Sequence, residues 1–350
     1  MVGEIVIGGR KIGEGKPCFI VAEAGVNHNG SLALARQLVE VAAECGAHAI
    51  KFQTFNAEKL VSPGAPKAAY QLQTTAVEES QFDMLKRLEL SPDAVRDLHA
   101  YSRDKGILFM STPFDEESAD FLDDLGVPVF KVSSGDLTNL PLLRHIAHKK
   151  RPVILSTGMA YLGEVETAVR AIEQEGNRSL VLLHCVSDYP AKPADVNLRA
   201  MQTLSFVFCL PVGFSDHTLG IEVALAAVAL GACVIEKHLT LDRELPGPDH
   251  QASLEPDELA ALVRGIRTVE ASLGSGHKQP SANEESTAEV ARKSLVAACD
   301  IPVGTRLSEE MVAIRRPGKG LPPALLPFLI GHNTRIAVPA GTLMTLEMLS

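Results

Sequence analysis

Short runs of β-branched and aliphatic residues recur from Phe19 onward, and each is followed by a polar tip and an amphipathic stretch with helical spacing. Eight such runs predict eight β-strands, at residues 19–25, 49–55, 106–114, 129–135, 152–159, 180–189, 211–218 and 233–241. Helical periodicity between them predicts helices at residues 31–45, 92–105, 116–125, 163–175, 221–230 and 256–273. Eight strand-then-helix units over about 250 residues are typical of a (β/α)8 TIM barrel, and an open α/β sheet of eight strands is the alternative.

Two segments depart from this alternation of strands and helices. The connection at residues 56–81 contains Pro63, Gly64 and Pro66, and a loop of this length after a strand end is a candidate lid. Residues 274–292 have the composition of a linker, and residues 293–350 carry short apolar runs separated by Pro/Gly turns. We therefore predict a barrel domain at 1–273, a linker at 274–292 and a small β domain at 293–350.

The composition favours the same fold class and limits the partners. Hydrophobic residues make up 46% of the 350 residues, but aromatic residues only 5%, so we expect an aliphatic core, as in parallel α/β proteins. The net charge of −10, without a long Lys/Arg run, argues against nucleic acid as a partner. The chain shows no signal-type N-terminus, no apolar segment of about eighteen residues and no C-x-x-C pair among its six cysteines. We therefore expect a cytoplasmic protein with free thiols and no membrane association.

Every predicted strand carries polar side chains at its C-terminal end, where the active sites of TIM barrels lie. An unpaired charge buried in a barrel is costly, so a purely structural chain would have little reason to place ionisable groups there. The pattern therefore predicts a polar site at this end of the barrel. In chain order the residues are Glu23, Asn27 and His28; Lys51 and Gln53; Ser111 and Thr112; Lys131, Ser133 and Ser134; Ser156 and Thr157; His184 and Tyr189; Ser215 and His217; Glu236 and His238.

Two lysines and several hydroxyls within this set are suited to binding phosphate. Lys51 and Lys131 supply positive charge, while the turn at 133–135 and the Ser/Thr hydroxyls supply directional donors. The alternative is that each hydroxyl caps the helix that follows it. That alternative explains a single hydroxyl well, but it does not explain both lysines.

Two histidines near the end of the predicted barrel indicate a metal site. Because side chains alternate along a strand, Ser215 shares a face with His217 and Glu236 shares one with His238, while Lys237 points the other way. Taken alone, the two histidines are better explained as structural residues. The lysines and hydroxyls that would face them, which are suited to binding phosphate, make a metal site the preferred interpretation. Without a cysteine at the strand ends, the pattern favours an open Mn²⁺ or Mg²⁺ site over a closed Zn²⁺ site. A Lewis acid opposite a phosphate site indicates the joining of a phosphorylated nucleophile to an aldehyde.

With these residues in place, the sequence resembles the sialic acid synthase family, which condenses phosphoenolpyruvate with an N-acetylated amino-sugar aldehyde. The C-terminal residues resemble the antifreeze-like domain of this family, which has a β-clip fold. No single motif is specific, but nine occur in the family's order across nearly the whole chain. They lie at residues 22–30, 51–54, 111–114, 131–135, 156–159, 214–218, 236–238, 247–250 and 316–320.

The resemblance implies roles for individual residues. His217 and His238 would hold the metal, Mn²⁺ first with Mg²⁺ or Co²⁺ as alternatives, and Glu23 would orient the reacting sugar oxygen or the attacking water. Arg316 would reach from the small domain of one subunit over the barrel of its partner, which implies a homodimer. Lys319 stands where the family commonly has Asn, which implies an effect on the loop surface only. Phosphoenolpyruvate would be bound by Lys51, Thr112, Lys131, Ser134 and Ser156, and the sugar by Gln53, Tyr189 and Asp249, with Phe114, Ser133, Ser215 and Glu236 beside the substrates.

The acceptor sugar that we expect is unphosphorylated N-acetylmannosamine, which would make the product N-acetylneuraminate. The first alternative is 2,4-diacetamido-2,4,6-trideoxymannose, which leads to legionaminic acid, and the 6-phosphate of N-acetylmannosamine is a further one. The family's reaction breaks the C–O bond of phosphoenolpyruvate and releases phosphate. Two other function classes remain: an aldolase with Lys51 or Lys131 as a Schiff-base nucleophile, and a non-catalytic binder acting through its C-terminal domain.

Overall fold

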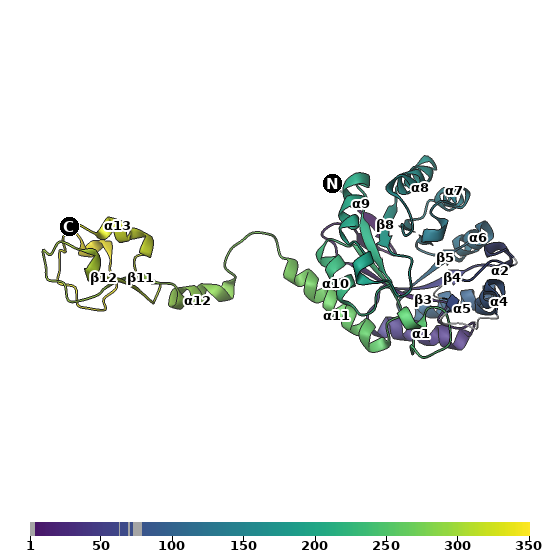
Figure 1. Ribbon diagram of the computed structural model, residues 1–350, viewed down its shortest axis with the longest axis horizontal. Helices are drawn as coiled ribbons and strands as arrows, with labels where there is room; N and C mark the ends of the chain where they lie inside the picture. The colour runs from purple at the N-terminus through teal and green to yellow at the C-terminus, as the bar shows by residue number, and fades with distance from the viewer. Residues whose placement is uncertain (1–3, 63, 69–70, 73–78) are drawn as a thin grey trace. The chain divides into compact units, whose positions relative to one another are not determined.

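The computed structural model describes residues 4–62, 64–68, 71–72 and 79–350 and shows a barrel of eight parallel strands (Figure 1). Hydrogen bonding orders the strands β5-β4-β3-β10-β9-β8-β7-β6, and β5 lies next to β6, which closes the ring. All eight predicted strands are confirmed, each within its predicted run, so the TIM barrel is correct and the open sheet is not. The strands are β3 (Phe19–Gly25), β4 (Ala49–Thr54), β5 (Leu108–Pro113), β6 (Phe130–Val132), β7 (Val153–Ser156), β8 (Leu180–Cys185), β9 (Val212–Asp216) and β10 (Val234–His238).

Helices surround the strands as an outer layer (Figure 1). The local sequence explains where they begin: the Ser31 side chain accepts a hydrogen bond from the Leu34 backbone N–H at the start of α1, and Asp115 caps α6 in the same way. Six of these helices were predicted, while α7 and α9 were not. The layer consists of α1 (Leu32–Glu44), α5 (Pro92–Asp104), α6 (Glu116–Leu125), α7 (Leu140–His148), α8 (Leu162–Gln174), α9 (Arg199–Phe208), α10 (Glu222–Ala229) and α11 (Pro256–Leu273).

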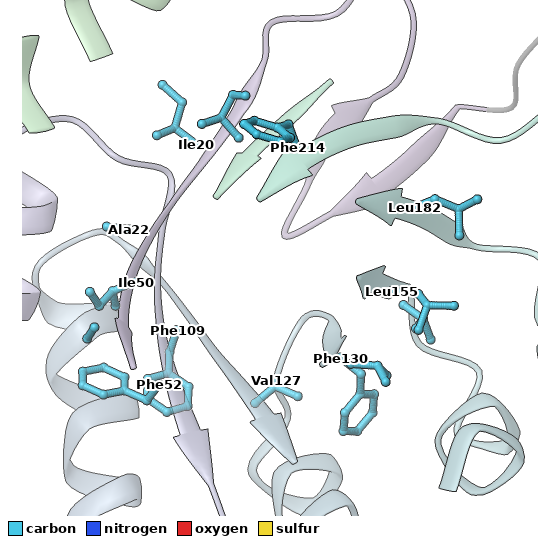
Figure 2. Packing of buried hydrophobic residues seen from close by; sticks show 14 of the residues in the cluster. Ile20, Ala22, Ile50, Phe52, Phe109, Val127, Phe130, Leu155, Leu182 and Phe214 are labelled. Carbon is cyan, nitrogen blue, oxygen red and sulfur yellow. The ribbon is translucent and has the colours of Figure 1, made fainter. Parts of the chain in front are cut away.

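The alternation of side chains along the strands produces two hydrophobic layers. Outward-facing residues such as Ile20, Ile50 and Phe214 pack against the helices (Figure 2). Inward-facing residues near the strand starts, such as Val21 and Met110, form a second cluster inside the barrel. Both layers are largely aliphatic, as the composition predicted.

An N-terminal hairpin closes the end of the barrel at which the strands begin. It consists of β1 (Ile5–Ile7) and β2 (Arg10–Ile12), which pair in antiparallel fashion. Ile5, Ile7 and Ile12 are buried and join the inner cluster. Apolar side chains of the hairpin therefore cover the inner cluster at this end of the barrel. This hairpin was not predicted from the sequence.

The chain divides into two compact units after Gly274. The second unit has its own hydrophobic core and a two-stranded antiparallel sheet of β11 (Ser294–Ala297) and β12 (Val312–Arg315), followed by the short helix α13 (Leu326–Leu329). The segment predicted as a linker contains a helix, α12 (Ala282–Ala291), which begins with a capping box between Ser281 and Glu284.

The long connection after β4 begins with α2 (Ala57–Leu60) and ends with α4 (Gln81–Leu88). Part of the predicted lid, residues 63, 69–70 and 73–78, lies outside the described residues. Within the described part of the chain, no helix is both long enough and apolar enough to cross a membrane.

Candidate active site

A cavity of about 470 Å³ opens at the C-terminal ends of the barrel strands. The strand order places side chains that are far apart in the sequence around one opening, because parallel strands all end at the same side of a barrel. Arg316 belongs to the second unit, and of the polar residues predicted at the strand ends Asn27, His28, Ser111, Thr157 and His184 do not line the cavity. Every other residue to which a catalytic, metal-binding or substrate-binding role was assigned does line it. These are Glu23, Lys51, Gln53, Thr112, Phe114, Lys131, Ser133, Ser134, Ser156, Tyr189, Ser215, His217, Glu236, His238 and Asp249.

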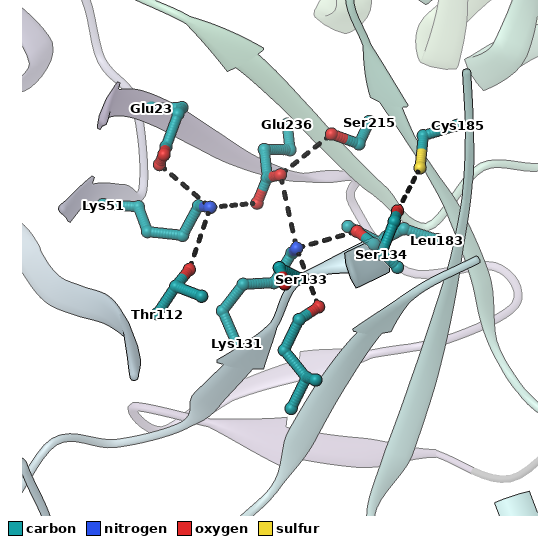
Figure 3. Close-up of polar contacts among 12 residues, drawn as sticks. Glu23, Lys51, Thr112, Lys131, Ser133, Ser134, Leu183, Cys185, Ser215 and Glu236 are labelled. Atoms are coloured by element: carbon teal, nitrogen blue, oxygen red, sulfur yellow. Dashed lines mark hydrogen bonds and ion pairs between the residues drawn. The ribbon is translucent and has the colours of Figure 1, made fainter. Parts of the chain in front are cut away.

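The two lysines of the cavity are held by buried carboxylates (Figure 3). Lys51 Nζ lies 3.0 Å from Glu23 Oε2 and 3.3 Å from Glu236 Oε2, and donates to Thr112 Oγ1 at 3.3 Å. Lys131 Nζ lies 3.6 Å from the other Glu236 oxygen, Oε1. The lysines and hydroxyls predicted to bind phosphate thus form a mixed-charge network with Glu23 and Glu236, a pairing that the sequence did not predict.

The two carboxylates of this network differ in their protonation preference. Burial, together with the charge of Glu236, raises the pKa of Glu23 despite the neighbouring lysines. Burial alone would also raise the pKa of Glu236, but Lys131 and Lys51 lower it below its usual range. One carboxyl group thus favours its protonated form and the other its ionised form, a division that suits acid–base chemistry.

Hydroxyls from the ends of β6 and β7 surround Lys131. Ser156 Oγ accepts a hydrogen bond from Lys131 Nζ at 2.7 Å, and Ser134 Oγ accepts one from the Gly158 backbone N–H at 3.0 Å. Ser133 behaves differently, because its side chain caps a short 3₁₀ turn by accepting from the Asp136 N–H at 3.3 Å. The helix-capping alternative is therefore correct for Ser133, although this residue also lines the cavity.

The side chain that faces the cavity at the end of β8 differs from the prediction. The ring of His184, predicted at this strand tip, is bonded through Nε2 to the Val196 carbonyl oxygen at 2.6 Å and does not line the cavity. Cys185 lines it instead, with Sγ 3.1 Å from Ser134 Oγ, although no cysteine was expected at the strand ends. Strand alternation gives the reason, since adjacent residues of β8 must face opposite sides. Counting that period from the inward-facing Leu183 would have identified Cys185.

The two predicted metal ligands face one another. The ring centroids of His217 and His238 are 5.5 Å apart, and the Tyr189 ring lies 4.1 Å from that of His217. His217 Nδ1 lies 2.6 Å from the Val186 carbonyl oxygen, so it carries the proton and leaves the Nε2 lone pair available. Burial lowers the pKa of His217 to about 4 and that of His238 well below its usual value. Both imidazoles are therefore neutral at physiological pH, which is the form that binds metals.

These residues fit an open divalent-metal site with two protein ligands. His238 Nδ1 is buried and has no hydrogen-bond partner among the described residues, while Asp249 Oδ2 lies 3.8 Å away. No cluster of three or more His, Cys, Asp or Glu side chains with metal-binding geometry occurs in the described part of the chain. Water and substrate oxygens would have to complete the coordination, as Mn²⁺ and Mg²⁺ permit.

The register predicted for β9 and β10 is confirmed by the side chains around the histidines. Ser215 Oγ donates to Glu236 Oε1 at 2.8 Å and lies 3.4 Å from His217 Nε2. Lys237 does not line the cavity and pairs with Asp216 on the other face of the strands.

Comparison with known proteins agrees with this geometry. A model of the NeuB family matches residues 38–278, and a model of the SAF domain matches residues 292–350. The N,N'-diacetyllegionaminic acid synthase of Legionella pneumophila is 49% identical over 96% of this chain and 95% of its own length. The N-acetylneuraminate-9-phosphate synthase of Homo sapiens is 40% identical over 94% of this chain and 92% of its own length. The crystal structure of N-acetylneuraminic acid synthetase from Leptospira borgpetersenii has a TM-score of 0.75 and 41% identity, covering 83% of this chain and 96% of that chain.

Proposed function

Because the chain belongs to the NeuB family, we propose that it joins phosphoenolpyruvate to the aldehyde carbon of an acetamido sugar, forming a nonulosonic acid and phosphate. The observation that carries this proposal is the convergence of two lysines, several hydroxyls and two neutral histidines in one cavity. The lysines and hydroxyls suit the anionic substrate, and the histidines suit the ion that would polarise the aldehyde.

In this reaction C3 of phosphoenolpyruvate forms a bond to the aldehyde carbon, water adds to C2, and phosphate leaves with its bridging oxygen. Lys51 and Lys131 hold the phosphate and carboxylate groups, and both lie beside the ionised Glu236. Glu23, whose pKa burial raises, exchanges a proton with the attacking water or the new hydroxyl. The divalent ion that His217 and His238 would hold, Mn²⁺ by our expectation, supplies Lewis-acid polarisation of the aldehyde oxygen.

For the acceptor we propose an unphosphorylated sugar, with 2,4-diacetamido-2,4,6-trideoxymannose ahead of N-acetylmannosamine. An apolar cluster from the ends of β3, β4 and β5 and from α4, which includes Leu85 and Phe114, lines part of the cavity beside the uncharged side chains of Gln53 and Gln81. Among the described residues lining the cavity, Lys51 and Lys131 are the only lysines or arginines. Both are proposed to bind phosphoenolpyruvate, so neither is left to bind a phosphate group on the sugar. An apolar wall suits a 6-deoxy sugar better than a 6-phosphate, and the Legionella relative named above supports the same order. This order reverses the expectation from the sequence alone.

Phosphate release tests the proposal. The purified chain is incubated with phosphoenolpyruvate, Mn²⁺ and one of three sugars: the diacetamido-trideoxy sugar, N-acetylmannosamine or its 6-phosphate. We expect kcat/KM to be highest for the diacetamido sugar and lowest for the 6-phosphate. Preference for the phosphorylated sugar would overturn the proposed acceptor class, and no release with any of the three would overturn the reaction itself.

Two further measurements separate this reaction from a Schiff-base aldolase. A chelator should abolish turnover and Mn²⁺ should restore it. Borohydride with the carbonyl substrate should leave the protein active, because the proposed reaction forms no Schiff base and both Lys51 and Lys131 pair with carboxylates. Covalent inactivation by borohydride would instead support the aldolase.

A further inference from the structure

A fully buried ion pair lies directly behind the two histidines, on the helix side of the strands. Asp216 and Lys237 are both completely excluded from solvent, and Lys237 Nζ lies 2.8 Å from Asp216 Oδ2. The two residues are register partners in the parallel strands β9 and β10. Each immediately precedes one of the proposed metal ligands, His217 and His238.

The pair is tied to the chain on both sides of His217. Asp216 Oδ1 accepts hydrogen bonds from the Thr218 backbone N–H at 2.9 Å and from Thr218 Oγ1 at 2.8 Å. Lys237 Nζ donates to the Thr218 carbonyl oxygen at 2.5 Å. The backbone that carries His217 is therefore held before and after the ring, and it is held by a side chain from the strand that carries His238.

Stability alone does not account for a charged pair at this position. Removing two charges from water is expensive, and buried ion pairs can often be replaced by apolar residues without loss of stability. What an ion pair supplies better than apolar packing is a fixed register between two strands. A slip of one residue would turn either histidine from the cavity face to the helix face.

We propose that Asp216 and Lys237 are positioning residues, which fix the register of β9 and β10 so that the His217 and His238 rings face each other across the cavity. This inference rests on the proposed function, in which the two histidines bind a divalent ion. Neither Asp216 nor Lys237 lines the cavity, so the pair would act through the histidines and leave the lysine side of the cavity unchanged.

The test measures metal and substrate binding separately in the full-length protein. Isothermal titration calorimetry of Mn²⁺ into the metal-free protein is compared for the wild type, Lys237→Met, Asp216→Ala and Asp216→Asn. We expect Lys237→Met and Asp216→Ala to weaken Mn²⁺ binding by about tenfold or more, the range seen when support behind metal ligands is removed. Asp216→Asn keeps a side-chain oxygen that can accept the hydrogen bonds from Thr218, so it should weaken Mn²⁺ binding less than Asp216→Ala does. Binding of phosphoenolpyruvate in the absence of metal should change less than about threefold.

Arg151→Met is the matched control, because it breaks a partly buried ion pair with Asp123 whose two residues do not line the cavity. It should leave Mn²⁺ affinity unchanged. Unaltered Mn²⁺ affinity in every Asp216 and Lys237 variant that folds would overturn the positioning role alone. Equal losses of Mn²⁺ and phosphoenolpyruvate affinity would also overturn it, since they would indicate general destabilisation. A wild-type protein that binds no Mn²⁺ would overturn the metal part of the proposed function and this inference with it.

Discussion

Lys51 is shared by two carboxylates that come from different strands, and this sharing sets the charge state of the cavity. Glu236, with a lowered pKa, remains ionised beside both lysines. Glu23 and Glu236 together raise the pKa of Lys51 against the effect of burial, whereas burial lowers the pKa of Lys131. Glu23, with a raised pKa, can still bind or release a proton near neutrality. Lys51 therefore serves anion binding and proton transfer, and removing Glu236 would leave Lys131 without its carboxylate partner in the network.

Lys131→Met should impair binding of phosphoenolpyruvate specifically. The variant removes one of the two cavity lysines proposed to pair with phosphoenolpyruvate. Truncating one partner of a buried, hydrogen-bonded charge pair costs roughly 2–5 kcal/mol of binding free energy. We expect KM for phosphoenolpyruvate to rise by about a hundredfold, measured from initial rates of phosphate release. Lys86→Met, at an exposed position of α4, is the control and should behave as the wild type. A change of less than about threefold in Lys131→Met would contradict the assigned role.

His28 should make the fold sensitive to acid. Burial lowers its pKa to about 4, and its Nδ1 accepts a hydrogen bond from the Gly30 N–H at 3.0 Å, which a protonated ring cannot do. Between about pH 6.5 and pH 4 the unfolded chain binds a proton that the folded chain does not, so the free energy of unfolding falls as pH falls.

Urea denaturation at pH 7.5 and pH 5 measures this dependence. Burial also lowers the pKa of His48 and His250 to about 4, so the wild type should lose stability through several groups. His28→Gln should reduce the loss by up to about 1.4 kcal/mol per pH unit. His277→Gln, at an exposed position, should leave it unchanged. Identical pH dependence in wild type and His28→Gln would exclude the assigned contribution.

At the scale of elements, the barrel interior leaves little room where β9 passes its neighbours. A Cβ at Gly213 would lie 2.7 Å from both Leu183 Cδ2 and Val234 Cβ, on the strands at either side, and would also meet the Val234 carbonyl oxygen. The glycine therefore allows the close approach that lets β9 present Ser215 and His217 at its end. The position of Ser215 and His217 therefore depends on the close packing of β9 at Gly213.

Gly213→Ala should destabilise the barrel by about 1–3 kcal/mol, the usual cost of overpacking a core. Urea denaturation followed by circular dichroism measures the change. Gly163→Ala is the matched control, because nothing lies within 4 Å of a Cβ there and the residue is in α8. Alanine also has the higher helix propensity, so this variant should gain up to about 1 kcal/mol. Equal stability of the two variants would contradict the close packing of β9.

At the scale of the whole molecule, the two compact units carry different parts of the expected site. The barrel holds the cavity with both lysines and both histidines, whereas Arg316 lies in the second unit. Each unit has its own hydrophobic core. The expected homodimer, in which Arg316 of one subunit covers the barrel of the other, remains a prediction that mixing experiments can decide.

Two inactive variants should complement each other if the site is shared between subunits. Arg316→Ala and Lys131→Met are each expected to lose most activity for different reasons. After mixed refolding, half of the dimers are heterodimers with one intact site, so about a quarter of wild-type activity should return. Sedimentation confirms the dimer, and Lys131→Met refolded alone is the control. No recovery, despite mixed dimers, would place Arg316 at the site of its own chain, and full activity of Arg316→Ala alone would remove it from catalysis.

The sequence by itself determined the strands, the barrel and the end at which the site lies. Strand alternation and helical spacing are local, and every strand of a parallel barrel ends on the same side, so a polar residue such as Lys51 or His238 could be assigned to the cavity without knowing its neighbours. The hairpin at the N-terminus could not be predicted in this way, because strands of three residues are too short to show the alternation of buried and exposed side chains.

Only the tertiary structure decided which groups interact. The sharing of Lys51 between Glu23 and Glu236 joins residues from three strands, and no local pattern encodes the distances between them. The same holds for the ion pair behind the histidines, because the sequence did not indicate that Asp216 and Lys237 pair with each other. Charge pairing and pKa depend on burial and on separations of a few ångströms, which arise only when the barrel closes.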